Sequence, residues 1–111
     1  MRLRERDKRD MTVVACTGFD DDVYQWGQGW QIRAAEYPNT RMLDAKIYGD
    51  RVREMKLLLY DKKDVLLEVG MGVSMDGDTP AYRIISVARW DHQSAVLEKI
   101  PEGRRGVWDN D

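Results

Sequence analysis

Few residues of this sequence are of a type and in a pattern that could perform catalysis. The one histidine, His92, follows Asp91 in a predicted turn, and an Asp–His pair can support general-base catalysis. No Gly-x-Ser-x-Gly segment supplies a serine nucleophile for this pair. A hydrogen-bonded turn histidine is therefore the favoured interpretation. The one cysteine, Cys16, lies in an apolar segment, whereas catalytic thiols need an accessible and electropositive surrounding, so we expect a buried structural residue.

Two further patterns resemble ligand sites but are incomplete. Asp20 and Asp22 have the spacing that begins a calcium loop, but Gln25 and Gln31 stand where that loop needs Gly and Glu. The pair Gly27-x-Gly29 does not continue into a phosphate-binding loop, because a predicted strand follows it in place of a helix. We therefore expect no metal, no cofactor and no catalytic residue, and we predict that the protein is not an enzyme.

The four tryptophans divide into two pairs. Trp30 and Trp90 follow the alternation of predicted strands, which is typical of core residues. Trp26 lies in a glycine-rich predicted turn and Trp108 in the C-terminal segment, where a small core covers them less easily. Because tryptophan is enriched at the centres of protein interfaces, Trp26 and Trp108 are candidate contacts to another chain.

Length and composition restrict the class of protein further. A chain of 111 residues forms one domain, and its hydrophobic content of 42% argues against bulk disorder. The 18 basic and 20 acidic side chains give a net charge of −2, which argues against a dedicated nucleic-acid binder. No apolar run approaches the ~18–20 residues that a membrane helix needs, so we expect no membrane partner.

Alternating apolar residues and turn signals predict a mainly β protein. We expect a small antiparallel β-barrel or sandwich over residues 1–103, a flexible C-terminal tail over 104–111, and mobile termini. Residues 18–29 are predicted to be a long turn, and a helical or irregular excursion is expected around 41–52, followed by a short helical turn within 61–75. The predicted strands cover 11–16, 30–36, 53–60, 71–75, 82–90 and 94–100.

The order of features over residues 1–100 carries a family resemblance. It rests on the segments Met1–Arg4, Asp20–Trp30, Ile32–Pro38, Thr40–Arg41, Asp44–Ala45, Gly49–Val52, Leu57–Tyr60, Pro80–Val87, with its Tyr-x-Ile-x-x-Val pattern, and Trp90 with Ala95–Ile100. Together these segments resemble the small bacteriophage head-closure, or head–tail joining (head–tail adaptor), family. The segment 61–75 departs from the family, because a short helical turn is predicted where the family has a plain loop.

The resemblance implies a structural protein of a phage or prophage virion, present in the bacterial cytoplasm during assembly. Its expected partners are a portal or connector and a tail protein, and its copies form a ring that helps close the DNA-filled head. The isolated chain can be a monomer, because ordering its loops costs free energy that a partner offsets. The candidate residues for ring or DNA contacts are Trp26, Arg41, Lys46, Arg51, Arg53 and Trp108, and the alternative for the four basic ones is a solvated face.

Two other functions remain as alternatives at this point. The first is a small nucleic-acid-binding barrel of the OB type, which would need stacking aromatic residues and a basic groove. The second, and the less favoured, is a small hydrolase that uses Asp91 and His92.

Overall fold

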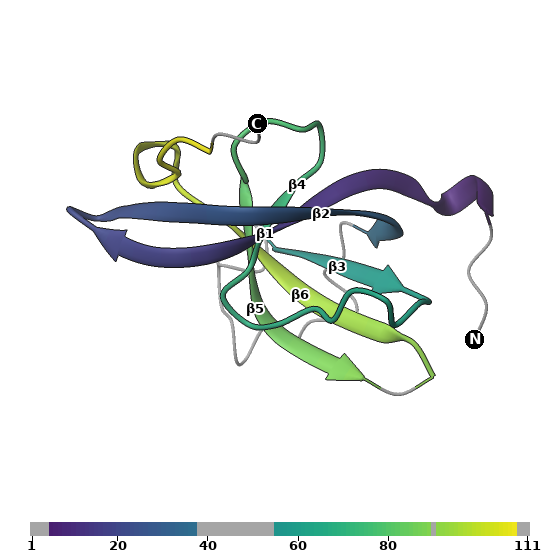
Figure 1. The fold of residues 1–111 in the computed structure, drawn as a ribbon. Coiled ribbons are helices and arrows are strands. Elements are labelled where there is room, and N and C mark those ends of the chain that lie inside the picture. The colour runs from purple at the N-terminus through teal and green to yellow at the C-terminus, as the bar shows by residue number, and fades with distance from the viewer. Residues whose placement is uncertain (1–4, 38–54, 90, 109–111) are drawn as a thin grey trace.

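The computed structural model describes residues 5–37, 55–89 and 91–108, and these fold into a closed antiparallel barrel (Figure 1). Neighbouring strands follow the order β1-β2-β3-β6-β5-β4, and β4 pairs with β1 to close the barrel. The mainly β prediction is confirmed, with a barrel and not a sandwich. The expected excursion around 41–52 lies outside the described residues. The elements are η1 (Glu5–Asp7), β1 (Arg9–Asp20), β2 (Val23–Tyr37), β3 (Met55–Tyr60), β4 (Gly72–Ser74), β5 (Tyr82–Arg89), β6 (Gln93–Lys99) and η3 (Glu102–Arg104).

The two longest strands form one hairpin that extends beyond the barrel (Figure 1). β1 and β2 pair from Arg9↔Ala34 to Asp20↔Val23, while β4 pairs with β1 only over Thr12–Val14 and β3 pairs with β2 only over Ala35–Tyr37. The outer half of the hairpin therefore lacks a second neighbouring strand among the described elements.

The turn of this hairpin is much tighter than the sequence indicated. Asp21 and Asp22 both have positive φ, 52° and 62°, as a two-residue turn with the twist of a hairpin requires. The prediction of a long turn over 18–29 is therefore wrong, because Gly27 and Gly29 lie within β2. Because these glycines lack side chains, Thr17 can approach Gly27 and Trp108 can cover Gly29. The residue types alone do not indicate these contacts.

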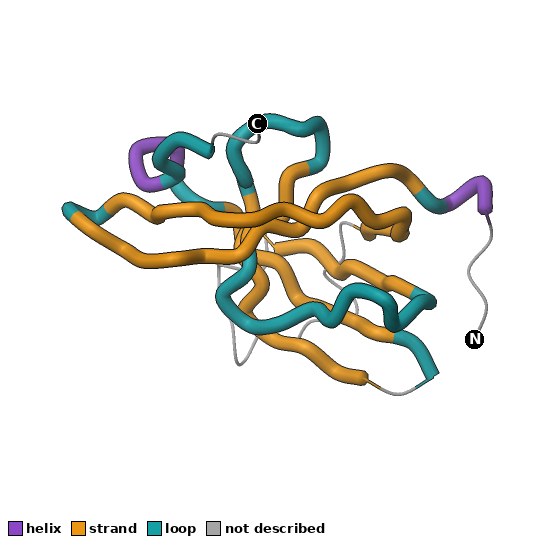
Figure 2. Tube along the Cα trace, in the orientation of Figure 1, coloured by secondary structure: helices purple, strands orange, loops and turns teal. Residues whose placement is uncertain are grey.

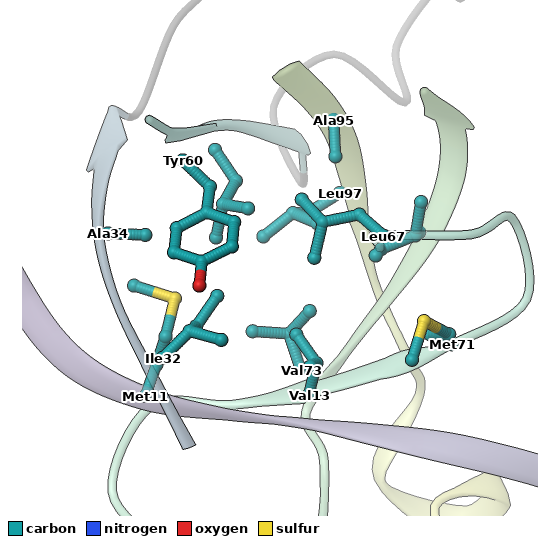
Figure 3. Packing of buried hydrophobic residues seen from close by; sticks show 12 residues of the cluster. Met11, Val13, Ile32, Ala34, Tyr60, Leu67, Met71, Val73, Ala95 and Leu97 are labelled. Atoms are coloured by element: carbon teal, nitrogen blue, oxygen red, sulfur yellow. The ribbon is translucent and has the colours of Figure 1, made fainter. Parts of the chain in front are cut away.

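The barrel interior is filled by inward-facing side chains from all six strands and from the loop between β3 and β4 (Figure 3). Because side chains alternate along a strand, β3 sends Leu58 and Tyr60 inward and Leu57 and Leu59 outward. The outward pair is also buried and packs with Ala35, so both faces of β3 are covered. The main core comprises Met11, Val13, Ile32, Ala34, Leu58, Tyr60, Leu67, Met71, Val73, Ile84, Ala95 and Leu97.

The segment between β3 and β4 is a loop, and the predicted short helical turn within 61–75 is not formed (Figure 2). Leu67 of this loop is fully buried in the core. Its N–H donates to Oε1 of Gln93 at 2.8 Å, and Nε2 of Gln93 donates to the carbonyls of Lys62 (2.9 Å) and Val65 (2.8 Å). One buried amide therefore satisfies three backbone groups, which removes the need for helical hydrogen bonds in the loop.

Candidate interaction surface

Trp26 lies on the part of β2 that extends beyond the barrel, and it is half-buried. Its ring closes on Gly72 at the start of β4, where a Cβ atom would come within 2.6 Å of the ring. Its Nε1 donates to the carbonyl oxygen of Arg105 at 2.6 Å. The predicted interface residue Trp26 therefore has an intramolecular partner for its polar group and contributes only part of its ring to the surface.

Trp26 belongs to a row of three aromatic residues on one face of the hairpin. Its ring stacks on Tyr24 at a centroid distance of 5.5 Å, and Tyr24 contacts Phe19 of the paired strand at 4.7 Å. Phe19 is 52% exposed. Cross-strand aromatic pairs stabilise a hairpin, so the row holds the extended hairpin straight and also presents apolar surface near its tip.

Trp108 holds the C-terminal segment on the same hairpin. Its Nε1 donates to the carbonyl oxygen of Gly27 at 3.0 Å, and its backbone N–H donates to Oγ1 of Thr79 at 3.2 Å. Its ring covers Gly29, where a Cβ atom would come within 2.6 Å of it. Residues 105–108 therefore pack on the barrel, although the sequence predicted a flexible tail from residue 104. Residues 109–111 lie outside the described part.

We call Arg105–Trp108 the C-terminal clasp, because it closes over one face of the hairpin. Arg105 accepts the bond from Trp26, and Trp108 covers Gly29. Gly29 and Gly72 both pair with Val14, so the Trp108 ring over Gly29 and the Trp26 ring against Gly72 lie on the same face of the sheet. Between them, Gly106 has a φ of 69°, and a Cβ atom there would come within 2.3 Å of the Tyr24 carbonyl oxygen. Only glycine fits this position.

The four basic candidates fall in a part of the chain without a structural description. Arg41, Lys46, Arg51 and Arg53 lie between β2 and β3, in the range 38–54 that is outside the described residues. Trp90, predicted to be a core residue, also lies outside them, whereas Trp30 packs against the main core. The structure therefore brings Trp26 and Trp108 onto one hairpin and does not place the four basic side chains.

The prediction that Cys16 is a buried structural residue is wrong. Cys16 is exposed, not buried, because it lies beyond the barrel where β1 has register shifts on either side of it. Its thiol donates to the Gly18 carbonyl oxygen at 3.4 Å. His92 is half-buried in the turn before β6, but its Nδ1 is buried and has no hydrogen-bond partner among the described residues. The predicted hydrogen bond of the turn histidine is therefore not made through Nδ1.

A cluster of ionisable groups that sequence reasoning missed lies where β3 ends. The Tyr60 hydroxyl donates to Asp64, and burial together with this bond raises the pKa of Tyr60 well above its usual value. The same bond lowers the pKa of Asp64. Nζ of Lys8 contacts Asp61 at 2.9 Å, and this bond lowers the pKa of Asp61. Tyr60 therefore stays protonated and both carboxyls stay ionised near neutral pH, which suits anchoring of the N-terminal segment better than proton transfer.

A groove of about 280 Å³ lies beside the aromatic row, between the hairpin and the end of β6. Arg83 places its guanidinium 5.8 Å from the centre of the Tyr24 ring, a cation–π contact at the wall of this groove. Lys99 and Arg104 are exposed on the other side, and Glu98 is the acidic residue of the lining. With three basic residues and one acidic residue, the groove carries a local excess of positive charge on an acidic protein.

Within residues 5–37, 55–89 and 91–108, no group of three or more His, Cys, Asp or Glu side chains is arranged to hold a metal ion. No helix in the described part of the chain is long and apolar enough to cross a membrane. The chain matches no protein-family model, no curated protein and no solved structure.

Proposed function

We propose that this protein is a structural component of a phage or prophage virion. It joins the portal or connector to the tail and helps close the DNA-filled head, without catalysing a reaction. The feature that carries the proposal is the β1–β2 hairpin, which extends from a rigid barrel and carries an aromatic row and three consecutive aspartates at its tip. Such a hairpin can reach into a neighbouring subunit while the barrel keeps its shape.

Physical considerations support a role in docking. The tip residues Asp20, Asp21 and Asp22 are exposed. Exposed like charges steer association toward a basic surface and fix the orientation of the encounter. Phe19, beside them, supplies apolar area of the kind found in the centres of interfaces. The head–tail joining resemblance of the sequence, which spans residues 1–100, supplies the identity of the partner in this proposal.

The test is association with a portal or connector ring from the same phage or prophage, measured by native mass spectrometry. We expect the wild type to bind and the double variant D21N/D22N to bind about tenfold more weakly. This change in Kd corresponds to a loss of about 1.4 kcal/mol in binding free energy. Asparagine tolerates positive φ, so the turn keeps its conformation. D76N/D78N is the matched control, because it removes two exposed carboxylates from another turn and should leave binding unchanged. Absence of binding by the wild type would reject the proposal.

A second candidate function is binding of single-stranded nucleic acid, and the groove beside Tyr24 favours it. A basic groove with an aromatic wall is what sequence-tolerant binding of single strands requires. The net charge of −2 opposes this function at long range, so the groove would have to act locally.

The second candidate is tested by a salt titration of binding to a single-stranded oligonucleotide. If the groove binds phosphates, K99Q/R104Q should weaken binding and reduce the salt dependence by about two charges. The control K62Q/K63Q removes two exposed lysines of the loop between β3 and β4 and should have no effect. No binding at low ionic strength would exclude this function.

A further inference from the structure

We propose that the C-terminal clasp is exchanged between copies of this chain. In the assembled form, Arg105–Trp108 of one copy closes on the β1–β2 hairpin of a second copy, where it makes the contacts that it makes within one molecule. The inference rests on the proposed function only in that an assembly supplies the neighbouring copies.

Most of the seat for the clasp lies on the hairpin, and Thr79, between β4 and β5, adds a hydrogen bond to the Trp108 backbone. The seat consists of backbone at Gly27 and Gly29 and of the Thr12 side chain, which lies beside the Trp108 ring. A Cβ atom at Gly29 would come within 2.6 Å of the ring and 2.9 Å of Thr12. These elements belong to β1 and β2, which pair with each other from Arg9↔Ala34 to Asp20↔Val23. The seat therefore accepts a clasp from either source.

The link between barrel and clasp favours exchange. β6 is followed by the buried Ile100, and then Pro101 and η3 (Glu102–Arg104) lead to the clasp. No residue of η3 is buried, and Pro101 starts it in an extended conformation with φ −54° and ψ 140°. Swinging the link outward exposes no buried side chain of η3, but it breaks the hydrogen bond from Nε of Arg105 to the Ile100 carbonyl oxygen at 2.9 Å. Exchange of identical elements keeps every contact and costs only association entropy, which makes it a low-cost route to oligomers.

A second copy would also cover apolar surface that the isolated molecule leaves in water. Val107 is 85% exposed between the two anchoring residues of the clasp, and Phe19 is 52% exposed near the hairpin tip. An exchanged clasp brings a second barrel next to this hairpin. Burial of such side chains at the new contact would favour the exchanged form over the closed monomer.

The first experiment tests complementation between two full-length variants by sedimentation at rising concentration. W108A lacks the clasp ring but keeps the seat, whereas G29V blocks the seat but keeps the clasp. We expect wild-type protein to self-associate, and we expect the two variants mixed to associate at least about tenfold more tightly than either variant alone. An equimolar mixture should recover association, because one intact clasp meets one intact seat. E102A, an exposed change in the link, is the control and should behave as wild type.

The second measurement needs no variant and remains informative if G29V fails to fold. Isotope-labelled and unlabelled wild-type chains are mixed, and filtered NMR experiments detect contacts between copies. We expect cross-copy contacts between the Trp108 ring and the Thr12 methyl group. Self-association without these contacts, or a mixture of W108A and G29V that associates no more tightly than either variant alone, would overturn the exchange and leave the proposed function standing. A strictly monomeric wild type would also overturn the exchange. The proposed function is tested separately, by binding to the portal or connector ring.

Discussion

At the scale of single residues, an ion pair with little exposure attaches the N-terminal segment to the barrel. The side chains of Lys8 and Asp61 are 7% and 15% exposed, and their charged atoms lie 2.9 Å apart. Oδ1 of Asp61 is buried and has no hydrogen-bond partner among the described residues. Lys8 therefore has to compensate most of the desolvation of this carboxylate, and losing it would leave a charge poorly satisfied.

This pair predicts a pH-dependent contribution to stability. The pKa of Asp61 is lower in the folded protein than in the unfolded chain, so the bond contributes fully above the unfolded pKa of about 4. The contribution is lost as the pH falls through the lower folded pKa. The variant K8M should therefore be less stable than wild type at pH 7 in urea unfolding, and the difference should shrink below about pH 4.

The control for K8M is K63M, which removes an exposed lysine of the next loop and should change stability little at any pH. A stability difference between wild type and K8M that stays constant down to the most acidic conditions would contradict the role of Asp61.

At the scale of elements, the loop between β3 and β4 acts as a plug for the barrel. Leu67 enters the main core, and its backbone N–H is held by Gln93. Its carbonyl oxygen accepts a hydrogen bond from Arg89, on the last position of β5. The loop has no helix or strand, but the backbone N–H and carbonyl oxygen of Leu67 are both hydrogen-bonded to side chains of the barrel. These tertiary contacts therefore determine the position of the loop.

Two adjacent leucines allow a matched test of the plug. L67A should destabilise the protein by about 2–5 kcal/mol, because it removes a fully buried side chain and leaves a cavity. L66A changes a side chain that is 54% exposed and should cost within about 0.5 kcal/mol, as for most surface changes. Both values are measured by urea unfolding. Equal effects of the two substitutions would mean that the loop does not plug the barrel.

At the scale of the whole molecule, stability is distributed unevenly between the barrel and the extended hairpin. β3 and β6 share a register of six residue pairs, and each also pairs with a further strand. Among the described strands, the outer half of the hairpin pairs only within itself, and the aromatic row, Arg83 and the clasp pack on it. An isolated two-stranded hairpin is marginally stable in water, so the clasp contributes to keeping this part ordered.

This arrangement predicts an order of hydrogen-exchange protection. Amides of Leu57–Leu59 in β3 should exchange at rates near those of global unfolding, whereas amides of Cys16–Gln25 at the hairpin end should exchange faster through local opening. In W108A, exchange at the hairpin end should accelerate further while β3 is unchanged. Uniform protection across hairpin and barrel, measured by mass spectrometry, would contradict this view.

The barrel strands could be predicted from the sequence to a useful extent. The apolar strand predicted over 82–90, its hairpin partner over 94–100 and the turn signals around residues 76–80 and 91–93 correspond to β5, β6 and their connections. These features are local, because the period of two and the turn residues act within a few positions of the chain. The same local rules wrongly predicted a long turn over 18–29. Glycine usually indicates a turn, but Gly29 lies within a strand, where its missing side chain makes room for the distant Trp108 ring.

The mainly β class of this protein follows from neighbouring residues, because strand periodicity and turn chemistry act over a few positions of the chain. Tertiary structure alone decided that Gly29 lies under Trp108, that Leu67 fills the barrel while Leu66 stays in water, and that Cys16 is exposed. These outcomes depend on pairs of residues 26 to 79 positions apart, such as Leu67 with Gln93 and Trp26 with Arg105. A local pattern reports which face of a strand is apolar, but it does not report which distant segment will cover that face.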